Sequence, residues 1–176
     1  MPEGRDFNAV VVADTHGQPH PRARKVIESL APDVIFHAGD IGELSVLDGL
    51  RELAPLFAVR GNIDERTPGL LDTMDVELRQ GERSVLKLLL VHIAVYGPKL
   101  RGDIARLAHA HSARLVLCGH SHVPFMGRDK GVTLFNPGSI GPRRFTLPIT
   151  LGVLSVGPSA ISLLHVSCET GETWLP

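Results

Sequence analysis

Side chains that bind metal ions follow short apolar runs at several points in the sequence. The run Val10-Val11-Val12-Ala13 leads directly into Asp14 and His16, and the run 34–36 is followed shortly by Asp40. Later residues of the same kind, each at or near the end of an apolar run, are Asn62, His92, His120 and His122. Carboxylate, imidazole and amide groups without thiolates suit a hard or borderline divalent ion.

These seven side chains are too many for one tetrahedral ion but enough for two ions that share a carboxylate. A pair of metal ions about 3.5–4 Å apart stabilises both the attacking and the leaving oxygen of an in-line displacement at phosphorus. The residue types therefore suffice for a two-metal site that could act in this way, provided that the fold brings them together.

Alternating strands and helices are expected in the first third of the chain. The apolar runs 10–13, 34–36 and 56–59 predict buried strands, and the periodicity of 22–30 and 44–53 predicts helices between them. Strands that alternate with helices favour parallel pairing through right-handed crossovers. The carboxyl ends of such strands lie at one edge of a sheet, where open α/β folds bind ligands.

The rest of the chain predicts a different pattern. We expect a loop or short helix over 67–75, then a hairpin of 76–79 and 84–95 whose second strand carries His92, a helix over 102–111 and a buried strand at 114–118. Short runs at 124–126, 132–135, 150–156 and 160–166 read as antiparallel strands. The predicted fold class is therefore α/β with a mixed sheet or two packed sheets.

The bulk composition is that of a folded protein. The 176 residues are 43% apolar and 21% charged, which predicts one domain over 1–176. A net charge of −1 gives no basic field for nucleic acid, and the apolar run 85–95 is too short to span a bilayer. With two cysteines and no signal-peptide pattern at the start, we expect a soluble cytoplasmic protein with no membrane association.

The motifs, taken in order, closely resemble those of the calcineurin-like metallophosphoesterases. They are Asp14-Thr15-His16, Gly39-Asp40, Gly61-Asn62-x-Asp64, an isolated His92 and Gly119-His120-Ser121-His122. The segment Asn136-Pro137-Gly138-Ser139 and the small size look like the compact bacterial and archaeal phosphodiesterases of that superfamily. The resemblance covers about 10–143.

This resemblance implies a fold, a cofactor and a reaction. The fold would be two packed mixed β-sheets flanked by helices, a four-layer sandwich. Asp14, His16 and His122 would hold one metal ion, Asn62, His92 and His120 the other, and Asp40 would bridge them. Manganese is the expected ion, with iron, zinc, magnesium, nickel and cobalt as alternatives. A metal-bridging hydroxide would hydrolyse a phosphodiester, and catalysis would depend on Asn62, Asp40 and His92.

Two residues depart from the family pattern. Ile63 stands where the family commonly has the histidine that protonates the leaving oxygen, and Ile93 stands where glycine usually follows the ligand histidine. General acid catalysis is worth a factor of roughly 10²–10⁴. We therefore predict phosphodiester hydrolysis, with activated aryl diesters turned over faster than alkyl monoesters.

Several other polar residues have two readings. Asp64 either orients part of the site or caps a short helix, and His37 either supports the site or is a satisfied interior histidine. Arg143 either binds a substrate phosphate or is a solvated loop cation. We expect structural roles for the remaining residues, which are His20, His109, His111, His165 and the core residue Cys118.

The substrate would be a small-molecule or nucleotide phosphodiester, and the protein could form a homodimer or a higher homo-oligomer. The alternative function is a non-catalytic protein-interaction module on the same fold, as in the retromer subunit that resembles these enzymes. Retention of all seven ligands favours the enzyme, whereas Ile63 favours the module. A mononuclear zinc amide hydrolase fits less well, because the chain has no His-Glu-x-x-His motif.

Overall fold

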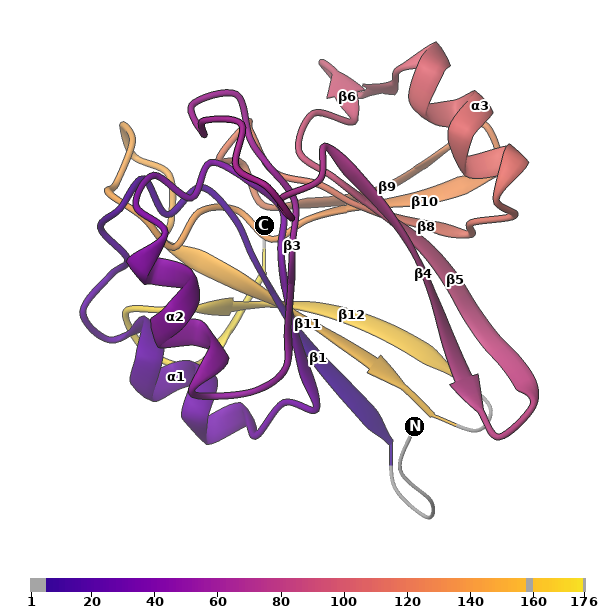
Figure 1. Cartoon of the computed structure of the whole chain (residues 1–176). Helices are drawn as coiled ribbons and strands as arrows, with labels where there is room; N and C mark the ends of the chain where they lie inside the picture. Colours follow the sequence, from indigo (N-terminus) through magenta and orange to yellow (C-terminus); the bar gives the residue numbers. More distant parts are fainter. Residues whose placement is uncertain (1–5, 158–159, 176) are drawn as a thin grey trace.

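Two mixed β-sheets face each other in the structure, a computed structural model that describes residues 6–157 and 160–175 (Figure 1). The first sheet has six strands in the order β13-β12-β11-β1-β2-β3. Its strands are β1 (Phe7–Val12), β2 (Val34–His37), β3 (Leu56–Ala58), β11 (Thr150–Val156), β12 (Ile161–Ser167) and β13 (Thr173–Trp174). β1, β2 and β3 pair in parallel, and the other pairs are antiparallel.

The second sheet has five strands in the order β4-β5-β8-β10-β9. They are β4 (Thr73–Gln80), β5 (Arg83–Val91), β8 (Leu115–Leu117), β9 (Phe125–Asp129) and β10 (Val132–Asn136). The short central strand β8 is parallel to both β5 and β10, and the two edge pairs are antiparallel. A two-stranded hairpin, β6 (Val95–Tyr96) with β7 (Lys99–Leu100), stands outside both sheets.

Helices cover the outer faces of the two sheets (Figure 1). α1 (Ala23–Leu30) and α2 (Ser45–Arg51) lie on the six-stranded sheet, and α3 (Gly102–Ala110) lies on the five-stranded sheet. The helices and sheets therefore stack in four layers. This confirms the expected class of two packed mixed sheets flanked by helices.

Alternate residues of the central strands fill separate layers of the core. Val11 and Phe36 pack between the sheets, against residues such as Leu88. Val10 and Ile35, one position earlier in each strand, pack beneath α1 and α2. Both faces of β1 and β2 are buried, which explains why these strands are continuous apolar runs without polar alternation.

The structure corrects several boundaries. β5 ends at Val91, so His92 follows the strand instead of lying within it. No helix forms in 67–75, where β4 already begins at Thr73, and β10 pairs with β8 in parallel. The short strands β6, β7 and β13 were not expected. Their backbone pairing depends on tertiary contacts, since two-residue strands leave no periodicity to detect.

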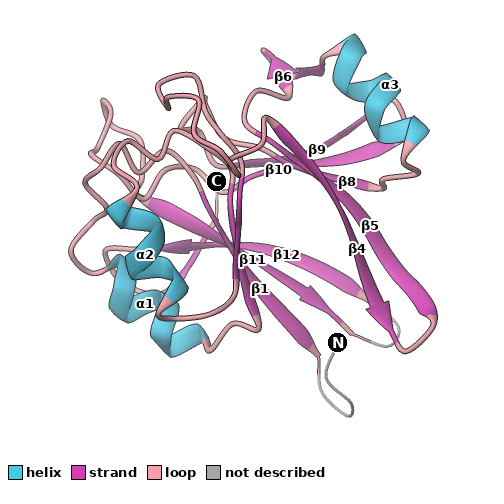
Figure 2. Cartoon of the chain, viewed as in Figure 1, coloured by secondary structure: helices cyan, strands magenta, loops and turns pink. Residues whose placement is uncertain are grey.

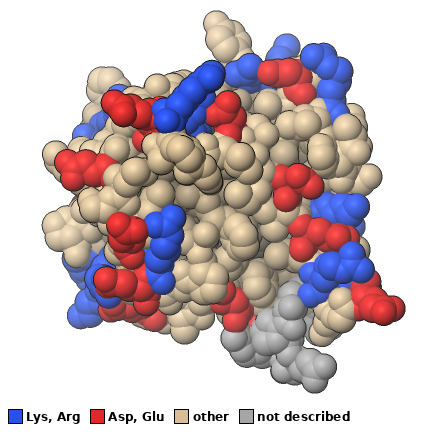
Figure 3. All heavy atoms as spheres, in the orientation of Figure 1, with Lys and Arg blue, Asp and Glu red and all other residues tan. Residues whose placement is uncertain are grey.

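Loops gather at one end of the two sheets, near the carboxyl ends of β1, β2, β3 and β8 (Figure 2). On the face drawn in Figure 3, acidic and basic side chains alternate around an uncharged centre. Within 6–157 and 160–175, every helix is too short to cross a bilayer.

Candidate metal centre

The first group of candidate ligands combines a loop after β1 with a loop after β8. Asp14, His16 and His122 offer one ligand atom each, and these atoms lie within 4.8 Å of one another. His16 Nε2 is 3.1 Å from His122 Nε2, which in turn is 3.5 Å from Asp14 Oδ1. Asp14 is fully buried, and its carboxylate also accepts the backbone N–H of His120 at 3.0 Å.

The second group combines the loops after β2, β3, β5 and β8. Asp40, His92 and His120 offer ligand atoms within 4.8 Å of one another. The amide oxygen of Asn62 joins them, at 3.1 Å from His92 Nε2 and 2.9 Å from His120 Nδ1. His92 Nδ1 lies 2.7 Å from the carbonyl oxygen of Ala38, and donation there leaves Nε2 free to bind a metal.

Asp40 lies between the two groups. Its Oδ1 is 3.1 Å from His92 Nε2 in the second group, and its Oδ2 is 3.9 Å from His16 Nε2 in the first. The backbone N–H of Ile63 donates to Oδ1 at 3.2 Å and helps to fix the carboxylate. All seven side chains expected as ligands therefore meet at one end of the molecule.

Five of these residues have left-handed backbone conformations. The φ angles are 56° for Asp14, 48° for His16, 54° for Asp40, 70° for His120 and 57° for His122. Such conformations are uncommon for residues other than glycine, although Asp and His tolerate them better than most. These conformations occur in the loops that follow β1, β2 and β8, where Asp14 and His16 join one ligand group while His120 and His122 join different groups.

Gly61 allows the loops after β2 and β3 to touch. A Cβ atom at this position would lie 2.1 Å from both the backbone nitrogen and Oδ1 of Asp40. No side chain fits at such distances. The glycine before Asn62 is therefore required for Asp40 and Asn62 to share one site.

Asp64 holds the same two loops together through backbone hydrogen bonds. Its carboxylate accepts the N–H groups of Ile41 at 3.1 Å, Gly42 at 2.9 Å and Gly61 at 2.7 Å. Residues 65–72 form no helix, so the helix-cap interpretation of Asp64 is wrong. Asp64 instead fixes the backbone on both sides of the site.

His37 links the loops that carry Asp14 and Asp40. Its Nδ1 accepts the N–H of Gly39 at 3.2 Å, so its Nε2 carries the proton and donates to Thr15 Oγ1 at 3.0 Å. The Thr15 hydroxyl in turn donates to the carbonyl of Ile41 at 2.9 Å. Burial lowers the pKa of His37 to about 4, which keeps the ring neutral.

The arrangement fits bound cations. His92 Nε2, Asp40 Oδ1 and Asn62 Oδ1 converge, and all three are acceptors when the histidine proton is on Nδ1, so a positive ion or an added proton must lie among them. Burial raises the pKa of Asp14 to about 7 and lowers that of His122 to about 4. A divalent ion binds ionised carboxylates and neutral imidazoles. A bound ion would also offset the free-energy cost of burying these polar groups without partners.

Arginine is present at the site, but at a different position from the one expected. The guanidinium of Arg143 donates to the Leu147 carbonyl at 2.8 Å and pairs with Glu169 at 2.6 Å. Arg144 instead places Nη2 at 3.3 Å from His16 Nε2. The sequence contains the pair Arg143-Arg144 without any signal that separates the two, since only the loop geometry decides which one points inward.

The residues for which structural roles are expected have contacts outside both ligand groups. His165 donates to the Asn136 carbonyl at 2.8 Å and stacks on Phe135, and His109 lies 2.9 Å from the Lys130 carbonyl. The rest are His20, beside the N–H of Arg22, His111, beside Asp75, and the buried Cys118.

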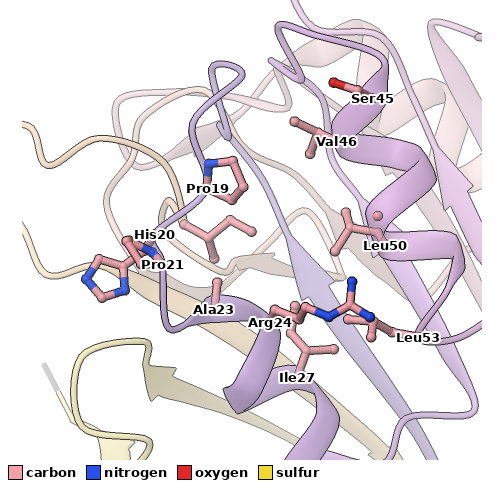
Figure 4. A pocket seen from close by; sticks show the side chains of 12 residues that line it. Pro19, His20, Pro21, Ala23, Arg24, Ile27, Ser45, Val46, Leu50 and Leu53 are labelled. Carbon is pink, nitrogen blue, oxygen red and sulfur yellow. The ribbon is translucent and has the colours of Figure 1, made fainter.

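Two hollows near the site loops differ in their relation to the ligands. One of about 350 Å³ lies between α1 and α2, where Ile27, Leu50 and Leu53 line it (Figure 4). It contains none of the candidate ligands. The other, of about 310 Å³, lies next to the second ligand group and includes His120 and Ile93 in its wall.

Comparison with known proteins identifies the family. The model of the calcineurin-like phosphoesterase superfamily domain matches residues 7–158, which is most of the chain. The chain belongs to this superfamily. The matched segment contains both ligand groups, so the converging Asp and His side chains lie within the phosphoesterase domain.

Two archaeal relatives carry names from the same superfamily. A probable metallophosphoesterase of Methanothermobacter thermautotrophicus is 32% identical over 146 residues, which are 78% of this chain and 80% of the relative. One of Methanocaldococcus jannaschii is 28% identical over 135 residues, or 73% of this chain and 66% of the relative. The match therefore spans slightly less than two thirds of the M. jannaschii protein.

Solved structures share the phosphoesterase fold. Vps29 from Entamoeba histolytica, crystallised with Zn²⁺, has a TM-score of 0.74 at 21% identity and covers 96% of each chain. The phosphoesterase YfcE of E. coli has a TM-score of 0.66 at 20% identity over 96% of this chain and 97% of its own. At these identities the comparison shows the fold alone.

Proposed function

We propose that this phosphoesterase-family protein is a dimetal-dependent phosphodiesterase. The observation that carries the proposal is the position of Asp40, whose two carboxylate oxygens face different ligand groups. A carboxylate placed in this way can be shared by two ions. Asp14, His16 and His122 would hold one ion, and Asn62, His92 and His120 would hold the other.

Two divalent ions, for which manganese is our candidate, would supply positive charge to the phosphoryl oxygens and lower the pKa of a bound water. The chain's own residues orient the substrate. Arg144 lies beside the first ligand group and provides a fixed positive charge for a phosphate oxygen. Asn62 contacts two imidazoles through its oxygen, which leaves its NH₂ group available to donate to the phosphate.

The preferred substrate follows from Ile63. This side chain is 46% exposed next to Asn62 and has no group that transfers a proton. A leaving oxygen that is stable as an anion needs no such help, whereas an alkoxide does. Aryl diesters should therefore react faster than alkyl monoesters.

The test is a steady-state comparison after metal removal and reloading with manganese. We expect turnover of bis(p-nitrophenyl) phosphate, a much lower kcat/KM for an alkyl monoester, and metal analysis near two ions per chain. Equal or faster hydrolysis of the alkyl monoester would contradict the proposed preference. Bound metal without turnover of any ester would contradict the enzyme and favour the interaction module, which the absence of a proton donor at position 63 also favours.

The variants Arg144→Ala and Arg143→Ala test the phosphate contact, with the second as the matched control. We expect Arg144→Ala to lower kcat/KM by about 10–100-fold, because a charged hydrogen bond contributes about 1.5–3 kcal/mol. Arg143→Ala should leave kcat/KM within about twofold, since its guanidinium faces Glu169. Equal losses in the two variants would remove the special role of Arg144.

A further inference from the structure

A pocket of about 310 Å³ adjoins the second ligand group. Residues 93–97 form one wall, and residues 119–121, with the candidate ligand His120, form the other. The β6–β7 hairpin begins inside this wall, and the N–H of Arg101 donates to the Ala94 carbonyl at 3.0 Å where the hairpin ends. The pocket is therefore built on a hydrogen-bonded turn.

The pocket wall is mainly apolar. Ile93 and Val95 are half-buried, and Tyr96 is 88% exposed at its edge. Besides Tyr96, the polar side chains that line the pocket are those of His120 and Ser121. The Oγ atom of Ser121 already accepts hydrogen bonds from the N–H groups of Asn136 at 3.1 Å and Val123 at 3.3 Å. No Asp, Glu, Lys or Arg is among the described residues that line it.

The two sides of the candidate centre thus differ in character. Arg144 places a positive charge beside His16, whereas apolar side chains lie beside His120. A phosphate held between the ligand groups would present its oxygens to the charge and one substituent to the apolar wall. Water in this pocket finds few hydrogen-bond partners, so an apolar group that displaces it gains affinity.

We infer that the pocket at 93–97 binds a planar aromatic ring carried on an ester oxygen of the substrate, with Tyr96 and Ile93 as specificity-determining residues. The inference rests on the proposed function and deepens it by naming the substituent. The exposed ring of Tyr96 at the edge of the pocket offers a face for stacking, and β-branched Ile93 adds a rigid apolar side chain to the lining.

Phosphonates test the pocket without turnover, because their carbon–phosphorus bond takes the place of the ester bond. We would measure the affinities of phenylphosphonate and methylphosphonate for the manganese-loaded protein by calorimetry and as inhibitors of bis(p-nitrophenyl) phosphate hydrolysis. Partial burial of a phenyl ring predicts about tenfold tighter binding of phenylphosphonate. Tyr96 is the only tyrosine of the chain, so tyrosine-labelled protein loaded with diamagnetic zinc reports ring contact through one set of NMR signals.

Variants at the pocket separate ring recognition from phosphate binding. Tyr96→Ala should reduce the tenfold preference to about threefold, and the double variant with Ile93→Ala should abolish it, while methylphosphonate affinity stays unchanged. Tyr96→Phe keeps the ring and should keep the preference. Leu164→Ala is the control, because Leu164 is 42% exposed on β12 of the other sheet.

Each outcome decides the inference. A preference for phenylphosphonate that disappears with the double variant, together with shifted Tyr96 signals, supports it. Equal affinities with normal turnover overturn it and leave the phosphodiesterase intact. A Tyr96 shift that is specific for phenylphosphonate, without turnover, would support the ring site and contradict the hydrolase. If neither turnover nor the Tyr96 shift is observed, both the ring site and the hydrolase are overturned. Adenosine 5′-monophosphate distinguishes a nucleotide from an aryl ester: tighter binding than phenylphosphonate, with a Tyr96 shift, supports a nucleobase, linked to the ester oxygen through ribose, as the ring.

Discussion

Single side chains at the candidate centre are held by contacts that leave them little freedom. Asp40 has a left-handed backbone conformation, and its carboxylate accepts a hydrogen bond from the Ile63 N–H and contacts the imidazole of His92. Burial opposes its charge, but the hydrogen bond and charge of His92 outweigh it and lower the pKa of Asp40 to about 2. The carboxylate is thus ionised across the physiological range and ready to bind cations.

Asp40→Asn tests the shared carboxylate. Asn tolerates the left-handed conformation, so the change removes the charge with little backbone strain. We expect loss of turnover by more than about 10³-fold and loss of paired metal binding in elemental analysis. His165→Ala should keep both, although the freed Asn136 carbonyl costs about 1–3 kcal/mol in the free energy of unfolding. Two ions retained in Asp40→Asn would contradict the bridging role.

His37 makes stability depend on pH. Its folded pKa of about 4 lies below the ordinary value of 6.5, so between these values the unfolded chain binds more protons. The free energy of unfolding therefore falls as the pH falls from 6.5 to 4, by on the order of 3 kcal/mol from this group.

His37→Gln keeps a donor and an acceptor but does not titrate. Urea unfolding between pH 4 and 7, with chelator present in every sample, should show a shallower slope for this variant than for the wild type. Parallel curves would mean that His37 does not remain neutral in the folded protein.

Pairs of loops, more than individual strands, are the elements that position the ligands. The loop after β2 and the loop after β3 touch at Gly61 and are joined by Asp64. Neither loop would hold its conformation alone, because the buried N–H groups of Ile41 and Gly61 and the more exposed N–H of Gly42 all donate to one carboxylate. The geometry of Asp40 and Asn62 is therefore a property of the pair.

Asp64→Ala should disrupt both loops at once. Three backbone donors would lose their acceptor, and we expect a loss of about 2–4 kcal/mol in the free energy of unfolding together with weaker metal binding. Asp72→Ala provides the control, because Asp72 pairs with Arg60 at the surface at 2.7 Å and should change stability by less than about 0.5 kcal/mol. Similar effects in both variants would show that Asp64 is an ordinary surface carboxylate.

At the scale of the whole molecule, each ligand group spans the two sheets. Asp14 and His16 follow a strand of the six-stranded sheet, and His122 follows a strand of the five-stranded sheet. The same holds for Asp40 against His92 and His120. Ions bound at these groups would link the sheets at their loop end and add to the apolar core that joins them.

Metal removal should therefore lower the stability of the entire fold. With free manganese at 100 times its Kd, one site adds about 2.7 kcal/mol, which for a chain of this size corresponds to a rise in Tm of roughly 5–10 °C. Thermal unfolding with manganese and with chelator measures the difference. The double variant Asp14→Asn/Asp40→Asn should not respond to chelator, and an equal response would place the stabilising ion elsewhere.

Local signals in the sequence predict the fold class and the ligand candidates. Apolar runs with both faces buried mark β1 and β2, helical periodicity marks α1 and α3, and the Asp and His residues stand directly after strands, where parallel sheets collect their loops. These signals are local, because they depend on the spacing of neighbouring residues. The seven candidate ligands could therefore be named before any distance was known.

Which loops meet depends on the three-dimensional packing of the chain. Arg144 rather than Arg143 points to His16, Asp64 accepts backbone groups from another loop, and residues 93–97 form a pocket beside His120. Each depends on φ angles and packing between segments 20 or more residues apart, as between Asp64 and Ile41 with a separation of 23. No periodicity encodes such contacts, because they arise from the way the two sheets and their loops pack against each other.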